Sequence, residues 1–340
     1  MKLRTIRYIF WFMGILIGMA GIVRCVKDAP RDNPLDPVVN PNKCWVQGTV
    51  YRYYPPFRPV SSARIQISPG NQWVDASPDG VFAFTDLQPG DYLLYASASG
   101  YSADTIHVSL EQSSGKTVQF NLNALPKIES FIVRSEHINM WRNPQSLYRL
   151  YVETTVSDPD GIWDVKNIRF LIPQFTFVDT INTSEYYDSP GKYIVHYSEN
   201  KLPGSSIENL LGYPMFIEAI DDINTSVLSS PVYLARIINM RPNTVEPQGF
   251  IYINDPRPVL KWQPVDELVY PFTYRIEVFW TISGVNKSYL KWSQNVMFET
   301  DSIRVSQPLD RDENYYWTVS VVDEFGNWSS SREAEFKVTQ

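Results

Sequence analysis

The sequence predicts an all-β protein built from tandem antiparallel β-sandwiches. No useful window shows helical periodicity; apolar residues instead alternate with period two in short runs. Gly, Pro, Asn and Asp separate these runs, as they do in the turns of antiparallel sheets. The 340 residues exceed what one hydrophobic core usually serves, so we expect several domains.

Composition limits the class of protein further. Apolar residues make up 44% of the chain, which is enough for packed cores and too many for a disordered chain. Two cysteines, Cys25 and Cys44, cannot form a disulfide framework or a four-thiolate zinc site. The net charge of −7 argues against a nucleic-acid partner, because such proteins usually present a basic face.

Residues 1–24 are predicted to be an export signal. Lys2, Arg4 and Arg7 form a basic start, and an apolar run of sixteen residues follows at 8–23. A membrane-spanning helix needs about 20 residues, so this run suits a secretion signal better than a membrane span.

The end of the signal allows more than one interpretation. Residues 22–25 (IleValArgCys) resemble the lipobox of bacterial lipoproteins, in which Cys25 is lipidated, although Arg24 stands where that box has a small residue. Alternatively, a signal peptidase cuts after Ala20, or the segment stays as an uncleaved anchor. The lipoprotein interpretation implies a lipid-anchored protein of the bacterial cell envelope, at the outer membrane on its periplasmic or surface face.

Residues 25–43 are predicted to form a tether, because they are polar, Pro-rich and aperiodic. The run at 31–37 (ArgAspAsnProLeuAspPro) resembles the tether that follows the lipid-bearing cysteine in many bacterial surface lipoproteins. Removal of residues 1–24 leaves 26 basic and 37 acidic residues, a net charge of −11. Anionic lipid repels such a chain, so a lipid anchor or a partner must hold it at a membrane.

The first sandwich is predicted over residues 44–124, with about seven strands. Gly80 and Gly90 supply the positive-φ turns between some of them. A characteristic set of residues occurs in order here: Gly48, Val50, Pro59, Val60, Ala63, Ile65, Asp79, Gly80, Phe82, Phe84, Leu87, Gly90, Tyr92, Leu94, Gly100, Tyr101 and Leu122. In this set the segment resembles the carboxypeptidase regulatory-like family, a transthyretin-like sandwich. The resemblance implies a folding or interaction module without peptidase activity, and related starch-binding folds add glycan binding by analogy only.

Two further sandwiches are predicted, over residues 125–238 and 239–340. In the last one, Trp262 stands where a core Trp belongs, and Leu309 and Tyr315 match a tyrosine corner, so it resembles a fibronectin type III domain. Residues 216–226 parallel residues 318–329: each segment has an alternating strand, an acidic turn, an Asn and a Ser. We therefore expect two immunoglobulin-like sandwiches in tandem.

The sequence contains no recognisable catalytic motif. The three histidines, His107, His137 and His196, show no metal-ligand spacing, and there is no nucleophile elbow or phosphate loop. His107 alternates with two apolar neighbours, so its side chain should face solvent. We expect a protein that is not an enzyme and needs no cofactor; a hydrolase without a recognisable motif is the alternative that stays open.

Acidic turns supply the candidates for a metal site. Asp158, Asp160 and Asp164 surround Gly161, and residues 221–222 could close on them from another loop. Calcium prefers several oxygens on flexible loops. Asp-Pro-Asp-Gly also forms a turn without any metal, so we expect no metal and name the three aspartates as calcium candidates.

Aromatic residues supply the candidates for ligand binding. The predicted platform comprises Tyr51, Tyr53, Tyr54, Phe57 and Trp73, with Trp141 as a further candidate. The competing interpretation is that these rings fill sandwich cores. If Cys25 carries lipid, Cys44 is a lone thiol; if it does not, the two could form a disulfide.

The sequence thus predicts a non-enzymatic, lipid-anchored cell-envelope protein that acts in adhesion, scaffolding or ligand binding. Its partners would be the membrane, through the anchor, and a protein or glycan. The alternative is a glycan-binding component of a polysaccharide-uptake system.

Overall fold

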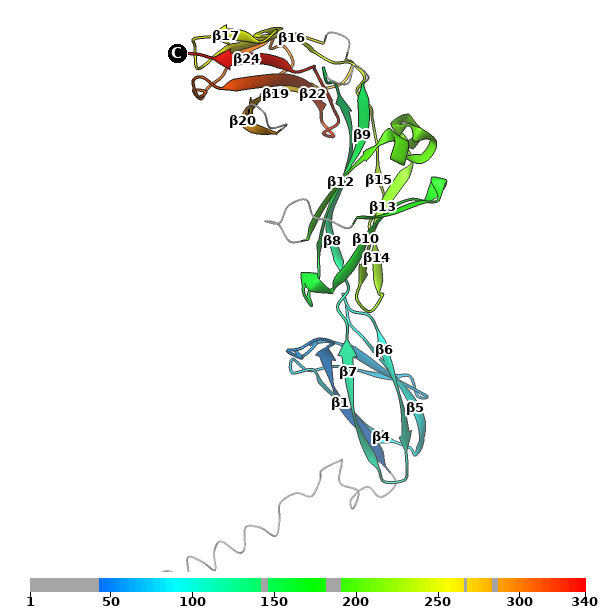
Figure 1. Ribbon diagram of the computed structural model, residues 1–340. Helices are drawn as coiled ribbons and strands as arrows, with labels where there is room; N and C mark the ends of the chain where they lie inside the picture. The colour runs from blue at the N-terminus through cyan, green and yellow to red at the C-terminus, as the bar shows by residue number, and fades with distance from the viewer. Residues whose placement is uncertain (1–42, 142–145, 182–190, 266–267, 283–286) are drawn as a thin grey trace, which may run out of the picture. The chain divides into compact units, whose positions relative to one another are not determined.

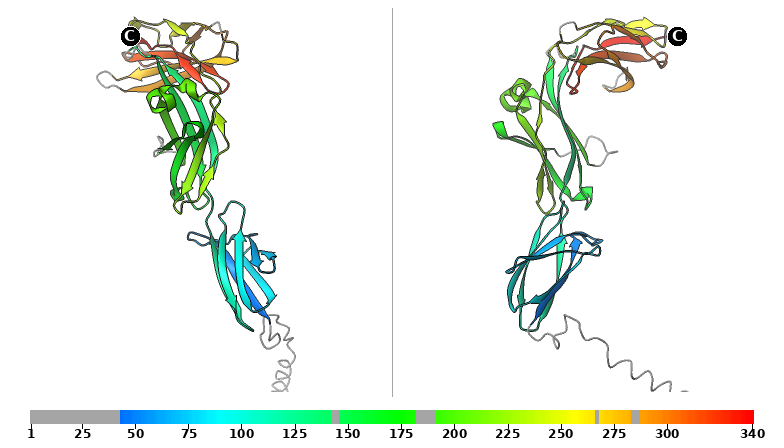
Figure 2. Two further views of the ribbon diagram at one scale, coloured as in Figure 1. Left: turned by 90° about the vertical axis from the view of Figure 1, so that its right-hand side faces the viewer. Right: turned by 180° about the vertical axis from the view of Figure 1, so that it is seen from behind.

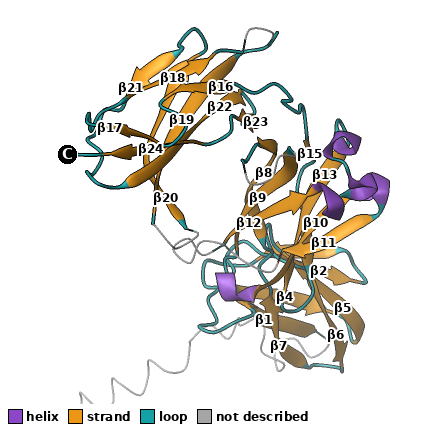
Figure 3. Ribbon diagram, turned by 45° about the horizontal axis from the view of Figure 1, so that its top comes forward, coloured by secondary structure: helices purple, strands orange, loops and turns teal. Residues whose placement is uncertain are grey.

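The computed structural model describes residues 43–141, 146–181, 191–265, 268–282 and 287–340 (Figure 1). The predicted signal, Cys25 and almost all of the tether lie outside these residues. The chain divides into two compact units, Met1–Ala124 and Leu125–Gln340. Within the described ranges the regular structure is strands and five short 3-10 turns, without an α-helix, which confirms the all-β class (Figure 3). No helix in those ranges has the length and hydropathy to cross a bilayer.

The first unit is a two-layered sandwich (Figure 2). Its strands are β1 (Cys44–Arg52), β2 (Arg64–Ser68), β3 (Gln72–Asp75), β4 (Val81–Leu87), β5 (Gly90–Ser97), β6 (Asp104–Leu110) and β7 (Gly115–Leu122). One sheet has the order β4-β1-β7 and the other β3-β2-β5-β6. β1 and β7 run parallel, and the other pairs are antiparallel. In β2, β5 and β6 of the second sheet, buried apolar residues alternate with outward-facing ones, so the outer face is available to solvent.

Two glycines of this sandwich fix close contacts. A Cβ on Gly48 would lie 2.3 Å from the carbonyl oxygen of Val118 and 2.7 Å from the ring of Phe82. Gly80 has a φ of 75°, and a Cβ there would lie 2.5 Å from the carbonyl oxygen of Val50. Both positions therefore need glycine, for reasons of space in the first and of space and backbone conformation in the second.

The second unit begins with a sandwich around a core that includes Leu150, Phe170 and Ile217. Its strands are β8 (Lys127–Ile138), β9 (Leu147–Ser157), β10 (Val165–Ile172), β11 (Phe177–Ile181), β12 (Lys192–Ser198), β13 (Pro214–Asp221), β14 (Ser226–Leu228) and β15 (Val232–Tyr233). One sheet runs β11-β10-β13-β14, with β15 also on β13, and the opposite sheet contains β12-β9-β8.

The last sandwich packs around Trp262, Tyr274 and Trp317. Its strands are β16 (Asn243–Glu246), β17 (Ile251–Ile253), β18 (Val259–Gln263), β19 (Phe272–Thr281), β20 (Ser288–Met297), β21 (Ser302–Arg304), β22 (Asn314–Asp323), β23 (Trp328–Ser330) and β24 (Ala334–Val338). One sheet is β16-β18-β21. The phenol of Tyr315 accepts a hydrogen bond from the Asp310 backbone N–H at 2.9 Å, which is the predicted tyrosine corner.

A parallel pairing joins the two sandwiches of the second unit. Trp328 and Ser329 of β23 pair with Glu136 and His137 of β8, so the order β12-β9-β8-β23-β22-β19-β20 is continuous. β24 also pairs with β22 and β17 in the same sheet. The sequence predicted two immunoglobulin-like sandwiches in tandem, and the structure adds a shared sheet between them.

Candidate functional site

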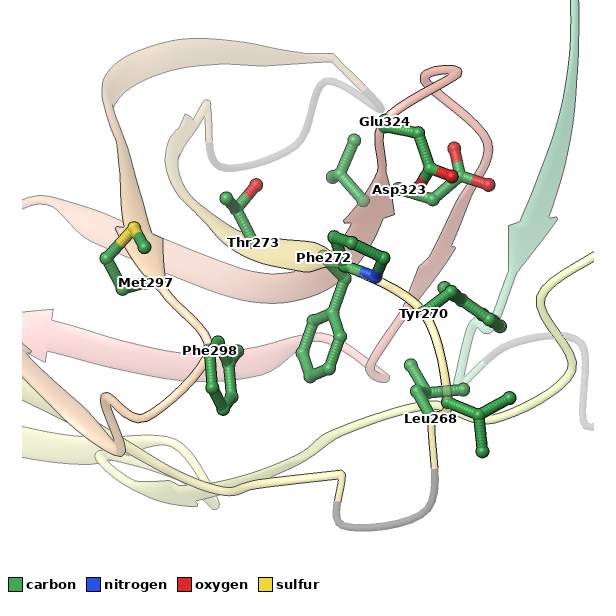
Figure 4. Close-up of a pocket in the computed structure, with 11 residues that line it drawn as sticks. Leu268, Tyr270, Phe272, Thr273, Met297, Phe298, Asp323 and Glu324 are labelled. Atoms are coloured by element: carbon green, nitrogen blue, oxygen red, sulfur yellow. The ribbon is translucent and has the colours of Figure 1, made fainter.

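A groove in the last sandwich is one concave feature of the described surface. It has a volume of about 660 Å³ and is lined by the ends of three strands and the segment before β19 (Figure 4). The lining residues are Leu268, Val269, Tyr270, Pro271, Phe272, Thr273, Met297, Phe298, Val322, Asp323 and Glu324. Its size and apolar lining are typical of sites that bind small ligands or extended side chains.

The floor of the groove crosses three strands. Thr273 pairs with Met297 on one side and with Val322 on the other, so their side chains lie in one row on the outer face of the sheet. The rings of Phe272 and Phe298 have centroids 5.8 Å apart and form the aromatic end. Phe298 and Met297 are exposed, which leaves apolar surface available to a ligand.

The opposite end of the groove is polar. Arg236 Nη1 lies 3.1 Å from Asp323 Oδ2 and 3.2 Å from Glu324 Oε2, and its guanidinium stacks on Tyr270 at 3.7 Å. Asp323 is buried and accepts hydrogen bonds from the backbone N–H groups of Phe325 and Asn327. Two carboxylates against one guanidinium leave one net negative charge beside an apolar trough.

Electrostatics fix the ionisation of this polar end. A hydrogen bond from its own backbone N–H and one from Arg236 lower the pKa of Glu324. Burial raises the pKa of the Tyr270 phenol, so it stays a neutral hydroxyl. The polar groups of the lining are Tyr270, Thr273, Asp323 and Glu324, and Arg236 holds the two carboxylates at one end of the groove.

None of the groove residues was singled out by the sequence. Thr273, Met297 and Val322 belong to three strands, and only strand register brings them into one row. The local signal that could have pointed to them is the apolar run Leu268 to Phe272 directly before a strand, where a polar loop is usual.

The three calcium candidates do come together. Oxygens of Asp158, Asp160 and Asp164 lie within 4.8 Å of one another, and Asp164 is fully buried. The backbone N–H of Asp222 donates to the Asp164 carbonyl at 2.9 Å, so the 221–222 turn lies beside them as expected. The Asp160 N–H also donates to Asp158 Oδ1 at 2.8 Å, which is the bond of a simple Asx turn.

The acidic cluster carries unfavourable charge. Burial is the largest cause that raises the pKa of Asp158 to about 6, and repulsion from Asp164, Asp160 and Asp221 adds to it, against the hydrogen bond from Asp160. A proton or a cation would each relieve this repulsion. The arrangement is therefore compatible with both interpretations made from the sequence.

The predicted aromatic platform is divided between two sheets. Tyr51 lies in β1, and Tyr53 and Tyr54 follow it, with their ring centroids 5.0 Å apart. Trp73 lies in β3, which belongs to the opposite sheet. Phe57 is exposed in the loop after β1.

Trp141 is exposed but fixed at one edge. Its backbone N–H donates to Glu333 Oε2 at 3.0 Å, and its indole N–H donates to the Glu333 carbonyl at 2.5 Å. This contact joins the end of β8 to the segment before β24, so Trp141 has a structural role in the second unit.

The histidines and Cys44 have structural surroundings. His107 is exposed, as predicted. His137 Nδ1 lies 2.9 Å from Ser329 Oγ, and His196 Nδ1 lies 2.9 Å from Glu136 Oε2. Cys44 is buried, with its Sγ 3.1 Å from the Glu111 carbonyl oxygen; whether it pairs with Cys25 lies outside the described residues.

Two family models match the chain. Residues 46–123 match the carboxypeptidase regulatory-like domain. Residues 243–339 match the Rha78A-like, N-terminal immunoglobulin domain. The chain carries a carboxypeptidase regulatory-like domain and an immunoglobulin-like domain. This confirms the resemblance seen in the first sandwich and the immunoglobulin-like class of the last one, and such domains are typically non-catalytic modules.

Solved structures of similar multidomain β-proteins also match. The FN1–FN3 domains of chicken CNTN1 are 13% identical, with 84% of this chain and 93% of that chain covered and a TM-score of 0.30. A candidate carbohydrate binding protein from Bacteroides uniformis is 11% identical, with 57% and 99% covered and a TM-score of 0.24. Fibronectin(III)-like modules of Clostridium thermocellum CbhA are 14% identical, with 64% and 95% covered and a TM-score of 0.26. No curated protein sequence matches the chain.

Proposed function

We propose that this protein is a lipid-anchored, non-catalytic component of the bacterial cell envelope that binds a partner through its β-sandwich modules. The observation that carries the proposal is the groove of the immunoglobulin-like domain, because it combines exposed apolar surface with a fixed polar end. The predicted signal, Cys25 and the Pro-rich tether support the proposed location at the cell envelope. Adhesion, scaffolding and ligand capture all need such a surface and no catalytic group.

Photo-crosslinking in intact cells tests whether the groove is occupied. A photoreactive residue at Val269, which is 97% exposed at the groove, should give a discrete adduct. Phe298→Asp places a charge among the apolar lining and should remove that adduct. The matched control is a photoreactive residue at Leu228, exposed in β14 of the other sandwich. The same adducts at both positions, or an adduct that survives Phe298→Asp, would contradict the proposal.

The second candidate function is glycan binding in a polysaccharide-uptake system. The observation that favours it is a pair of exposed aromatic side chains, Trp73 and Tyr95, on one face of the carboxypeptidase regulatory-like domain. Growth on a polysaccharide that depends on this protein, together with direct binding of that polysaccharide, separates this function from scaffolding.

A further inference from the structure

The outer face of the sheet β3-β2-β5-β6 presents a row of side chains that crosses all four strands. Gln66 pairs with Trp73 on one side and with Tyr95 on the other, and Tyr95 pairs with Thr105. Paired residues of neighbouring strands point to the same face, so the row reads Trp73, Gln66, Tyr95, Thr105. All four side chains are exposed.

The two aromatic rings are large and accessible, and they lie two strands apart in the same row. Trp73 is 56% exposed and Tyr95 is 43% exposed, although each lies inside a strand and not in a loop. They are two strands apart, which corresponds to about 10 Å from the usual spacing of neighbouring strands. A second row beside them contains Leu93 paired with His107, both exposed.

Neighbouring residues hold the Trp73 ring in place. The Arg64 guanidinium stacks on it at 4.2 Å, and Arg64 Nε donates to Asp75 Oδ1 at 3.1 Å. This ion pair fixes Arg64 against one side of the indole while more than half of the side chain stays accessible. A ring that is already oriented loses less conformational entropy when a ligand stacks on it.

The chemistry of this face fits a chain of sugars. The C–H faces of pyranose rings stack on aromatic rings, and their hydroxyls bond to the amide and hydroxyl groups that Gln66 and Thr105 place between and beside the rings. An extended glycan advances by close to one strand spacing per sugar, so alternate sugars meet the two rings. A protein interface usually has a continuous apolar centre, whereas polar Gln66 separates the rings here.

The net charge of the protein favours neutral glycans over acidic ones. Without residues 1–24 the chain has 26 basic and 37 acidic residues. The four side chains of the row are uncharged, and the charge of Arg64, which stacks on Trp73, is paired with Asp75. A strongly acidic protein repels polyanions, so a neutral glycan is favoured over an acidic one.

We propose that Trp73, Gln66, Tyr95 and Thr105 form a platform that binds an extended neutral polysaccharide lying across the strands. This inference rests on the second candidate function and is independent of the groove in the immunoglobulin-like domain. It replaces the platform predicted from the sequence: it keeps Trp73, adds Tyr95, and does not use the loop around Phe57.

Calorimetric titration of the full mature chain tests the platform. The probes are soluble β-glucan, xylan and mannan, with polygalacturonate as the anionic comparison. We expect a neutral polysaccharide to bind and polygalacturonate not to bind. Trp73→Ala and Tyr95→Ala should each weaken binding about tenfold, and Trp73→Phe should retain part of it. The matched control Phe57→Ala removes a ring that is 53% exposed outside the platform, and it should change nothing.

Three outcomes would overturn the platform. They are the absence of binding to every neutral polysaccharide, binding that survives the Trp73→Ala/Tyr95→Ala double variant, and binding that is lost in Phe272→Ala instead. The last result would move the glycan to the groove and leave the proposed binding function standing. Circular dichroism and the melting temperature of each variant establish that it is folded; this control matters most for Phe272→Ala, because Phe272 is half-buried and packs against the core of its sandwich.

Discussion

His137 and Asp158 are titratable residues whose surroundings oppose their charged forms. His137 is buried, its ring stacks on Tyr148 with centroids 4.2 Å apart, and it contacts Ser329. Burial is the main cause that lowers its pKa to about 4; a backbone hydrogen bond at Ile238 opposes the shift and Arg241 adds to it. Asp158 shows the opposite shift, because burial disfavours a carboxylate as it disfavours an imidazolium.

Replacement of His137 should reduce acid sensitivity. The pKa of histidine is about 6.5 in an unfolded chain, above the folded value, so neutral His137 contributes its full stability above that pH. This contribution is lost as pH falls from about 6.5 toward 4, by about 2 to 3 kcal/mol. In urea unfolding at pH 7.5 and 4.5, His137→Gln should lose less stability than the wild type. The exposed His107→Gln is the control and should follow the wild type; an equal loss in His137→Gln would refute the account.

Replacement of Asp158 should stabilise the protein at neutral pH. Its folded pKa of about 6 lies above the unfolded value of about 3.9, so the folded state binds a proton more tightly. Stability from that proton is complete below about pH 4 and is lost as pH rises to 6. With chelator present, Asp158→Asn should therefore raise the melting temperature at pH 7.5 and change it little at pH 4. A lower melting temperature at pH 7.5 would contradict the repulsion described for this cluster.

The effect of calcium on the melting temperature can be measured with the same two proteins, the wild type and Asp158→Asn. If calcium relieves the repulsion, millimolar Ca²⁺ should raise the melting temperature of the wild type more than that of Asp158→Asn. An unchanged melting temperature in the wild type removes the calcium interpretation and leaves the Asp-Pro-Asp-Gly segment as a turn.

At the scale of elements, the alternation of apolar and polar residues predicted where the strands lie but not which strands pair with each other. Trp262, Leu309 and Tyr315 occupy the expected core and corner positions, because these are local patterns that recur in sandwiches. The β8–β23 pairing joins residues about 190 positions apart in the sequence, and no local pattern encodes such a contact. The groove and the Trp73–Tyr95 row escaped sequence reasoning for the same reason, since both depend on register.

Asn327 is one of the side chains that bond across the β8–β23 pairing, as His137 and Asn139 also do. Its Oδ1 accepts a hydrogen bond from the Ser135 N–H at 2.8 Å, and its Nδ2 donates to Asp323 Oδ2 at 3.0 Å, all in buried surroundings. Asn327→Ala leaves the Ser135 N–H without its acceptor and should cost about 1–3 kcal/mol. Amide hydrogen exchange should accelerate at Ser135.

The control for this prediction is Asn295→Ala, which removes an exposed amide from β20 of the same sheet. It should leave both the stability and the exchange at Ser135 unchanged. Wild-type protection of Ser135 in Asn327→Ala would show that the backbone pairing holds the junction without this side chain.

At the scale of the whole molecule, each part of the chain has one proposed role. We propose that the predicted signal and tether direct and hold the protein, and that the sandwiches present its binding surfaces. If residues 1–24 are removed, the net charge is −11 and anionic lipid repels the chain, so a location at a membrane would need a lipid anchor or a partner. Composition and motifs predicted the fold class and the expected cellular location. The proposed binding surfaces could not be predicted in this way, because strand pairing in the folded protein brings their residues together.

Mass spectrometry of the mature N-terminus, purified from the membrane fraction, tests the central claim most directly. The account predicts a chain that begins at Cys25 and carries the mass of a diacylglyceryl group, and that leaves the membrane fraction in Cys25→Ala. An unmodified chain that begins at Gly21 would contradict it.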